Sequence, residues 1–371
     1  MKDFKAVAQE MLSFADVKIN GNHLGDIKVI NPQFYSRVLA GGSLALGESY
    51  MDGWWECKNL DVFFAKVLRA GLDKKVLKLH NILPLFLKAK LTNMQSRSRA
   101  KQVGEQHYDV GNDLYKLMLD KRMCYSCGYW KNAKTLDESQ EAKLDLICRK
   151  LKLGKGMKVL DIGCGWGSFA KFAAERYGVN VVGITISKEQ AKLAKERCAG
   201  LNVEIRLEDY RNIKEKFDRI LSIGMFEHVG PKNYREYMEA VHRCLKDDGL
   251  MMIHTIGGNI SVKALEPWFN KYIFPNGVLP SVKQIAAAAE GLFVLTDWHS
   301  FGAYYDKTLM AWIDNFRKGW NKIKSRYNER FYRMWMYYLS SSAGSFRANQ
   351  NQLWQVVYSK LGSKPDYERV C

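Results

Sequence analysis

The segment VLDIGCGWG (159–167) constrains the fold of this chain more than any other. An apolar run closes in a G-x-G-x-G turn, and an amphipathic helical pattern then continues through Tyr177. Further apolar runs and helical segments alternate after it, at 180–187, 188–198, 203–207, 217–224, 232–246 and 250–257. Apolar strands that alternate with amphipathic helices form a parallel sheet covered on both faces. Because such crossovers are right-handed, we predict a doubly wound, Rossmann-like α/β sheet.

The regions on either side of this pattern are predicted to be mainly helical. The elements expected there are a helix at 4–18, short helices over 31–71 broken at Gly41–Gly42 and Asp52–Gly53, long helices over 316–339 and a last strand at 353–361. We therefore predict a small helical N-terminal domain (1–75), a basic linker (76–102) and a large domain (103–371).

The formal net charge of +18 calls for an anionic partner, which could be nucleic acid, an acidic membrane surface or a charged cofactor. Residues 69–101 contain nine Lys or Arg residues and one acid, Asp73. Apolar residues alternate with these lysines, which suits a membrane interface and, equally, a solvated linker packed on the N-terminal domain. The apolar runs 83–87 and 250–253 are far shorter than the roughly 20 residues of a membrane span. The N-terminus also lacks the uninterrupted apolar segment of a secretory signal.

The segment CYSCGYW (124–130) places two cysteines at CxxC spacing, which is compatible with a redox pair, half of a metal site or the wall of a pocket. The eight cysteines of the chain show no framework spacing, so we expect reduced thiols in the cytoplasm. No second CxxC and no His pair at ligand spacing accompanies Cys124 and Cys127, so we expect no metal.

The glycine turn resembles motif I of the class I S-adenosylmethionine-dependent methyltransferases, because Asp161 lies two residues before its first glycine. In that class the loop cradles the methionine portion of the cofactor. One feature of the class is missing, since the second strand ends in Thr185 and Ser187 and the first carboxylate after it is Glu189.

Motifs along almost the whole chain are similar to those of bacterial cyclopropane-fatty-acyl-phospholipid synthases, in which a threonine also replaces the acid on the second strand. They are GESYMDGWWE (47–56), HYDVGNDLY (107–115), YSCGYW (125–130), LDIGCGWG (160–167), GITISKEQ (183–190), GMFEHVG (224–230), HTIG (254–257), KYIFPNG (271–277) and LWQVV (353–357). The resemblance implies that residues 103–371 form a catalytic domain. Its reaction would add the methyl carbon of S-adenosylmethionine across a cis double bond of a phospholipid acyl chain, after which a proton is lost and a cyclopropane ring closes.

The resemblance also implies a set of site residues. A bound bicarbonate would act as the base in a pocket of Cys127, Glu227, His254, the backbone at Ile256, and Tyr305. Residues implied to bind S-adenosylmethionine are Tyr125, Ser126, Asp161, Gly163, Cys164, Gly165, Thr185, Ile186, Ser187, Gln190, Asp209 and Tyr210, with His107 and Tyr108 at the border of the site. Glu227 could accept the proton of bicarbonate or fix the tautomer of His254, and spacing alone does not separate His254 from His228.

The family further implies a homodimer in the cytoplasm that docks on the anionic inner face of the cell membrane, with residues 1–75 serving docking or dimerisation and with no nucleic acid as partner. Three other functions are weighed against this one. An RNA methyltransferase would suit the positive charge, although no RNA-binding module is recognisable. A related lipid enzyme could stop at a methyl branch, and a lipid-binding protein could have lost catalysis altogether.

Overall fold

The computed structural model describes residues 4–72, 110–363 and 367–371, and the chain divides into two compact units. One unit comprises residues 93–263, 276–304 and 352–371, and the other comprises residues 1–92, 264–275 and 305–351. The predicted boundaries between the N-terminal domain, the linker and the large domain lie at 73–109, outside the described residues, so that division stays a prediction. Residues 305–351, which the sequence analysis assigns to the large domain, group instead with the N-terminal helices.

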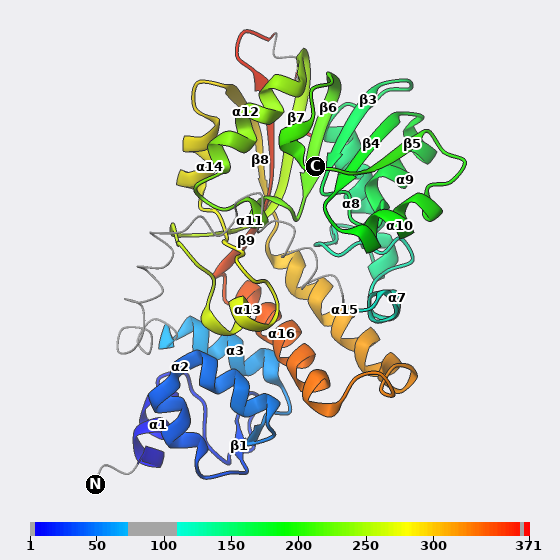
Figure 1. The fold of residues 1–371 in the computed structure, drawn as a ribbon. Coiled ribbons are helices and arrows are strands. Elements are labelled where there is room, and N and C mark those ends of the chain that lie inside the picture. The colour runs from blue at the N-terminus through cyan, green and yellow to red at the C-terminus, as the bar shows by residue number, and fades with distance from the viewer. Residues whose placement is uncertain (1–3, 73–109, 364–366) are drawn as a thin grey trace. The chain divides into compact units, whose positions relative to one another are not determined.

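The larger unit is built on a seven-stranded sheet whose order is β5-β4-β3-β6-β7-β9-β8 (Figure 1). Its strands are β3 (Lys158–Ile162), β4 (Asn180–Thr185), β5 (Val203–Leu207), β6 (Phe217–Ile223), β7 (Leu245–Gly258), β8 (Phe293–Ser300) and β9 (Asn351–Lys360). Its helices are α7 (Asn112–Met118), α8 (Leu136–Lys150), α9 (Ser168–Tyr177), α10 (Lys188–Arg197), α11 (Phe226–Val229), α12 (Tyr234–Cys244) and α14 (Val282–Ala289), with a 3₁₀ turn at Tyr210–Asn212. β3 pairs in parallel with both β4 and β6, β4 with β5, and β6 with β7. This confirms the predicted doubly wound sheet.

Alternate residues of each central strand point to opposite faces of the sheet, as strand geometry requires. On β3, Leu160 and Ile162 pack in one apolar core together with residues of α11, α12 and α14. Val159 packs in a second core together with residues of α8 and α9. Both faces are therefore covered by helices, and Asp161 shares the face of Val159.

The sheet ends in a strand pair that the sequence pattern predicted only in part. β9 is the expected last strand, and it pairs antiparallel with β8. β8 was not predicted, because its sequence FVLTDWHS mixes apolar, polar and charged residues and exposes Val294 and Leu295. The pairing with β9 assigns this stretch as an edge strand, which local composition alone does not reveal.

The smaller unit is mainly helical, as predicted for its N-terminal part. Its elements are α1 (Phe4–Ser13), β1 (Lys28–Val29), α2 (Phe34–Met51), β2 (Trp55–Glu56), α3 (Leu60–Arg69), α13 (Pro267–Tyr272), most of α15 (Ala303–Gly319), a 3₁₀ turn at Trp320–Lys322, and α16 (Glu329–Arg347). α2 is interrupted at Gly42, where φ is 59°, in agreement with the predicted break. Buried rings form much of its core, since Trp55 packs on Phe63, and Trp268 packs on Tyr337.

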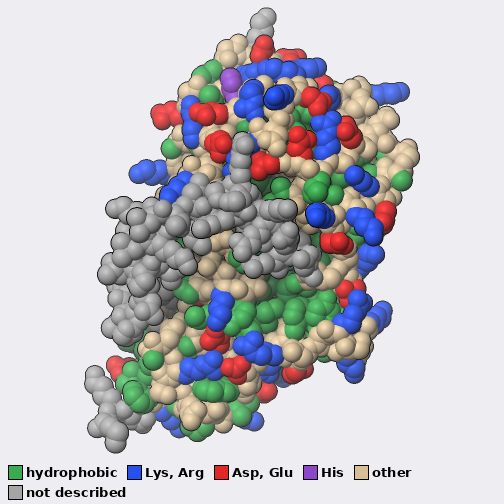
Figure 2. Space-filling model, in the orientation of Figure 1, with side chains coloured by type: hydrophobic (Ala, Val, Ile, Leu, Met, Phe, Trp, Pro, Cys, Tyr) green, Lys and Arg blue, Asp and Glu red, His purple; other side chains and the backbone are tan. Residues whose placement is uncertain are grey.

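None of the described helices is both long enough and apolar enough to cross a membrane. Over the part of the view that holds the seven-stranded sheet, basic and acidic side chains are interspersed (Figure 2). Ion pairs of this unit include Arg206–Glu215 and Lys246–Asp218.

Candidate active site

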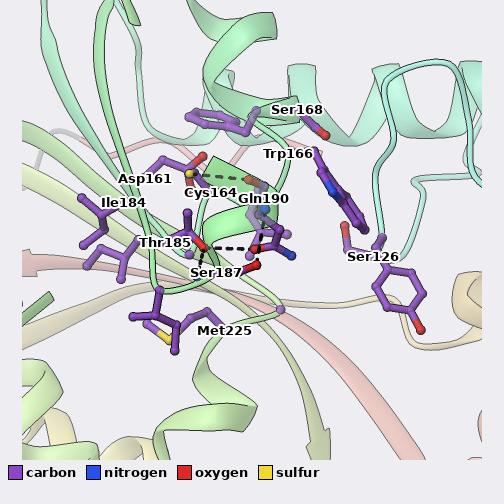
Figure 3. A pocket seen from close by; sticks show the side chains of 18 of the residues that line it. Ser126, Asp161, Cys164, Trp166, Ser168, Ile184, Thr185, Ser187, Gln190 and Met225 are labelled. Carbon is purple, nitrogen blue, oxygen red and sulfur yellow. Dashed lines mark hydrogen bonds between the residues drawn. The ribbon is translucent and has the colours of Figure 1, made fainter. Parts of the chain in front are cut away.

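A cavity of the larger unit is formed by loops that follow the carboxyl ends of β3, β4, β5 and β6, and by the segment before α8 (Figure 3). Ligands of doubly wound sheets bind at this edge. All twelve residues predicted to bind the cofactor line this cavity: Tyr125, Ser126, Asp161, Gly163, Cys164, Gly165, Thr185, Ile186, Ser187, Gln190, Asp209 and Tyr210. Their role in binding stays a prediction. His107 and Tyr108 lie outside the described residues.

The glycine turn after β3 brings bare backbone to the cavity. Gly163 has φ of +80°, a backbone conformation that residues with a side chain rarely adopt. A Cβ placed on it would also lie 2.7 Å from Cγ of Met225 and would clash with it. At Gly165, where φ is +56°, no atom lies within 4 Å of an added Cβ. The amides of Gly163 and Cys164 both donate to the carbonyl of Ile184 at 2.9 Å, which ties the loop to β4.

The end of β4 and the start of α10 carry hydroxyls and an amide, and no carboxylate among them lines the cavity. Thr185 Oγ1 donates to Gln190 Oε1 at 3.0 Å, and Ser187 Oγ accepts the amide of Gln190 at 3.3 Å and caps α10 (Figure 3). Glu189 is exposed and does not line the cavity. Carboxylates come from the next strand instead, because Glu208 and Asp209 line the cavity after β5.

Cys124, Tyr125 and Ser126 line the cavity, Cys127 is not among its lining residues, and both cysteines are free thiols. Cys124 packs in the core formed with α8 and α9. Cys127 is fully buried, and its thiol donates to the carbonyl of Gly128 at 3.2 Å. The segment is held by α8, since Gln140 Nε2 donates to the carbonyl of Ser126 at 2.7 Å.

Sequence reasoning missed Lys143, a lysine on α8 that also lines the cavity. Its Nζ donates to Ser126 Oγ at 2.9 Å, and its side chain is buried. The signal was present in the helical spacing, because Gln140, Lys143, Leu144 and Ile147 form one stripe and all four are buried. A lysine inside an apolar stripe is a functional candidate.

Further buried polar side chains lie on α11, β7 and β9. Glu227 Oε1 accepts the amide of Ile256 at 2.7 Å, so the structure brings these two predicted residues together. Among the described residues, the buried Oε2 has no hydrogen-bond partner. Burial raises the pKa of Glu227 to about 7, although its hydrogen bond from Ile256 acts in the opposite direction.

His254 lies on β7, two residues before Ile256, and Gln355 on β9 contacts its ring. The amide nitrogen of Gln355 faces Nδ1 at 3.3 Å. Because an amide nitrogen can only donate, Nδ1 accepts and the imidazole proton resides on Nε2. Within the described residues, Nε2 is buried without a partner. Burial, with the charges of Lys143 and Lys150, holds the pKa of His254 well below its usual range, so the ring is neutral.

The contacts of the His254 ring bear on one of the two roles predicted for Glu227, which is to fix the tautomer of His254. Gln355, and not Glu227, contacts the ring nitrogen that sets the tautomer of His254. Among the described residues, His254 Nε2–H is a buried donor without a partner, and Glu227 Oε2 is a buried acceptor without a partner. Gln355 was missed because it belongs to β9, about one hundred residues away from His254 along the chain.

The remaining candidates are placed as follows. His228 lines the cofactor cavity, and burial lowers its pKa to about 4. Tyr305 belongs to the smaller unit, where it stacks on Phe346 with ring centres 4.5 Å apart. Its membership of the bicarbonate pocket stays a prediction. Among the described residues, no cluster of His, Cys, Asp and Glu has the arrangement of a metal site.

Comparison with known proteins decides the family. The family model described as mycolic acid cyclopropane synthetase matches residues 95–356. The chain is 56% identical over 361 residues to cyclopropane-fatty-acyl-phospholipid synthase of Escherichia coli, an alignment that covers 95% of this chain and 93% of that protein. The chain belongs to the mycolic acid cyclopropane synthetase family. Cyclopropane mycolic acid synthase 1 of Mycobacterium tuberculosis, another relative, is 37% identical over 66% of this chain and 91% of its own length.

Solved structures agree with this family and with the class I methyltransferase fold. The cyclopropane synthase MmaA2 from Mycobacterium tuberculosis superposes with a TM-score of 0.66 at 32% identity, covering 70% of this chain and 98% of that one. The mycolic acid cyclopropane synthase CmaA1, solved with S-adenosylhomocysteine and CTAB, has the same TM-score at 34% identity, and the match covers 70% of this chain and 98% of CmaA1. Coclaurine N-methyltransferase shares the fold at 21% identity, with a TM-score of 0.70 over 85% of this chain and 99% of its own.

Proposed function

We propose that this chain transfers a methylene group from S-adenosylmethionine to the cis double bond of unsaturated phospholipid acyl chains and so forms a cyclopropane ring. The observation that carries the proposal is the 56% identity to the Escherichia coli synthase across 95% of the chain. The cavity supports it, because twelve residues expected at the cofactor meet there.

In the proposed reaction the alkene attacks the sulfonium methyl group, and S-adenosylhomocysteine leaves with the electron pair of the broken C–S bond. An alkene is a weak nucleophile, so the alignment of the two substrates contributes more than activation of either. A carbocation develops on the other alkene carbon. Loss of a proton from the transferred methyl group then closes the ring, provided that water is excluded.

We further propose that a bicarbonate ion, bound by Glu227 and His254, acts as the base that accepts this proton. Bicarbonate has oxygens that accept hydrogen bonds and one O–H that donates. His254 Nε2–H and Glu227 Oε2, the buried atoms without partners in the described chain, match those two needs. The proposed pocket also takes in Cys127.

A single incubation tests the activity. Purified protein is mixed with methyl-labelled S-adenosylmethionine and vesicles of a cis-unsaturated phospholipid, and the released acyl chains are analysed by mass spectrometry. We expect each product chain to gain one CH₂ without branching. A branched chain would indicate transfer without ring closure, and label found only in added RNA would overturn the lipid assignment.

Replacing Cys127 with Ser is expected to leave activity within about tenfold of the unaltered protein, which is the effect of one neutral hydrogen bond. Serine keeps a small donor at this fully buried position. Initial rates of methylene transfer measure the effect, with Cys127→Val as the matched variant that removes the donor and is expected to lose more. A folded Cys127→Ser protein without activity would contradict the role of a pocket wall and would indicate an essential thiolate.

We also propose that the protein acts in the cytoplasm as a homodimer docked on the anionic inner face of the membrane, through residues 1–75 and the basic stretch 69–101. Most of that stretch lies outside the described residues. Four large apolar side chains of the N-terminal segment, Phe4, Phe14, Leu24 and Ile30, expose more than half of their surface, which suits contact with lipid. Co-sedimentation with anionic vesicles should exceed that with zwitterionic vesicles at equal ionic strength, and sedimentation velocity should give the mass of a dimer.

A further inference from the structure

The cofactor cavity contains a buried cation that the proposed reaction does not yet use. Lys143 projects from the core-facing stripe of α8, and only 1% of its surface is exposed. Its Nζ lines the cavity and donates to Ser126 Oγ at 2.9 Å. Across the described residues, this hydroxyl is the hydrogen-bond partner of Nζ, and no carboxylate lies within ion-pair distance.

Such an ammonium group requires an anion. It carries three donors and a full charge, and burying it beside one neutral hydroxyl is strongly unfavourable unless an anion or further acceptors complete its surroundings. Ser126 accepts from Nζ and therefore keeps its own hydroxyl proton for a further acceptor. The two side chains together present several donors toward the same part of the cavity.

A carboxyl group, that of Asp161, lines the same cavity but makes no hydrogen bond or ion pair with Lys143. Asp161 shares the sheet face that α8 and α9 cover, and 2% of its surface is exposed. Its Oδ2 has no partner among the described residues. Burial raises the pKa of Asp161 to about 7, and the charge of Lys143 acts in the opposite direction. The cavity thus contains the ammonium group of Lys143 and the carboxyl group of Asp161, which are not bonded to each other.

We propose that Lys143, with Ser126, binds the α-carboxylate of S-adenosylmethionine, while Asp161 binds its α-ammonium group. The amino-acid end of this ligand is the zwitterion that a separated ammonium and carboxyl complement. Lys143 is therefore the residue that makes the cavity specific for a complete methionyl group. The inference rests on the proposed function only in taking S-adenosylmethionine as the ligand.

The test compares two ligands that differ only in the carboxylate: S-adenosylmethionine and decarboxylated S-adenosylmethionine. Their dissociation constants are measured by isothermal titration calorimetry without lipid. We expect the unaltered protein to bind S-adenosylmethionine at least about tenfold more tightly, as for a charge-assisted hydrogen-bonded pair. In Lys143→Met the ratio should fall to within about threefold, mainly through weaker binding of S-adenosylmethionine.

Gln140→Met is the matched control, because Gln140 holds the same segment through the carbonyl of Ser126 but carries no charge. Gln140→Met should weaken the binding of both ligands by the same factor and leave the ratio of their dissociation constants unchanged. If Lys143→Met lowers the affinity for both ligands by the same factor, Lys143 has a merely structural role and the inference is overturned.

Two further results keep the test decisive. If Lys143→Met does not fold, the unaltered protein still tests the inference, because equal affinity for the two ligands would overturn it. Lys143→Arg should retain part of the preference for S-adenosylmethionine over its decarboxylated form. Failure to bind either ligand would instead overturn the proposed function, so the two failures are distinguishable.

Discussion

Glu227→Gln is expected to reduce cyclopropane formation by at least about 100-fold, the range typical of losing an acid–base group. The amide oxygen of glutamine can still accept the amide of Ile256, which Glu227 Oε1 accepts at 2.7 Å. The other oxygen, Oε2, becomes an NH₂ group, so the unused acceptor facing the proposed bicarbonate becomes a donor. The rate of methylene transfer measures the effect.

The same substitution is expected to stabilise the folded protein at alkaline pH. In the folded state the pKa of Glu227 is about 7, raised above the ordinary value of 4.5 by burial. Between these values the folded state holds a proton that the unfolded chain has lost, so stability falls as pH rises from 4.5 to 7 and stays low above it. Removing the ionisable group should therefore raise the free energy of unfolding at pH 8 by on the order of 2 kcal/mol, with the difference shrinking toward pH 4.5.

Denaturant unfolding at several pH values measures this second effect. Glu239→Gln is the matched control, because Glu239 is an exposed glutamate on α12 paired with Arg235. It should change neither activity nor the pH dependence of stability. Full activity in Glu227→Gln, or a stability gain that is independent of pH, would contradict the placement of Glu227 as a buried functional carboxyl.

Lys150→Met is expected to destabilise the protein by about 3 kcal/mol, because it breaks a buried ion pair and leaves the buried Asp297 facing Arg369, a largely exposed partner whose Nε lies 3.4 Å from Asp297 Oδ1. Lys150 Nζ lies 2.8 Å from Asp297 Oδ2, and the two side chains are 0% and 3% exposed. The pair links α8 to β8. Since α8 also carries Gln140 and Lys143, loss of the pair should loosen the wall of the cofactor cavity as well.

Chemical denaturation of three variants separates this effect from a general effect of the substitution. The double variant Lys150→Met/Asp297→Leu removes both charges and should recover most of the lost stability. Arg149→Met removes the neighbouring exposed pair with Asp145 and should change stability by less than about 0.5 kcal/mol. A double variant as unstable as Lys150→Met alone would show that packing, and not charge pairing, makes Lys150 important.

Local patterns were sufficient to predict the central sheet. The strands from β3 to β7 were predicted from apolar runs, and the turn after β3 from its glycines, which do adopt positive φ at Gly163, Gly165 and Gly167. Each of these features depends on residues that are close in sequence. The loops at strand ends therefore located the cofactor cavity, and the family motifs named residues that line it.

What the sequence by itself determined about this protein is thus its fold class, its family and the loops that surround one cavity, because these follow from residues a few positions apart. Only the tertiary structure decided which distant groups meet. Lys143 reaches Ser126 from α8, Gln355 reaches His254 from β9, and β8 becomes a strand only by pairing with β9. The physical reason is that burial and hydrogen-bond partners are properties of packing between elements. A lysine or a glutamine with no partner nearby in sequence acquires its chemistry only when the chain has folded around it.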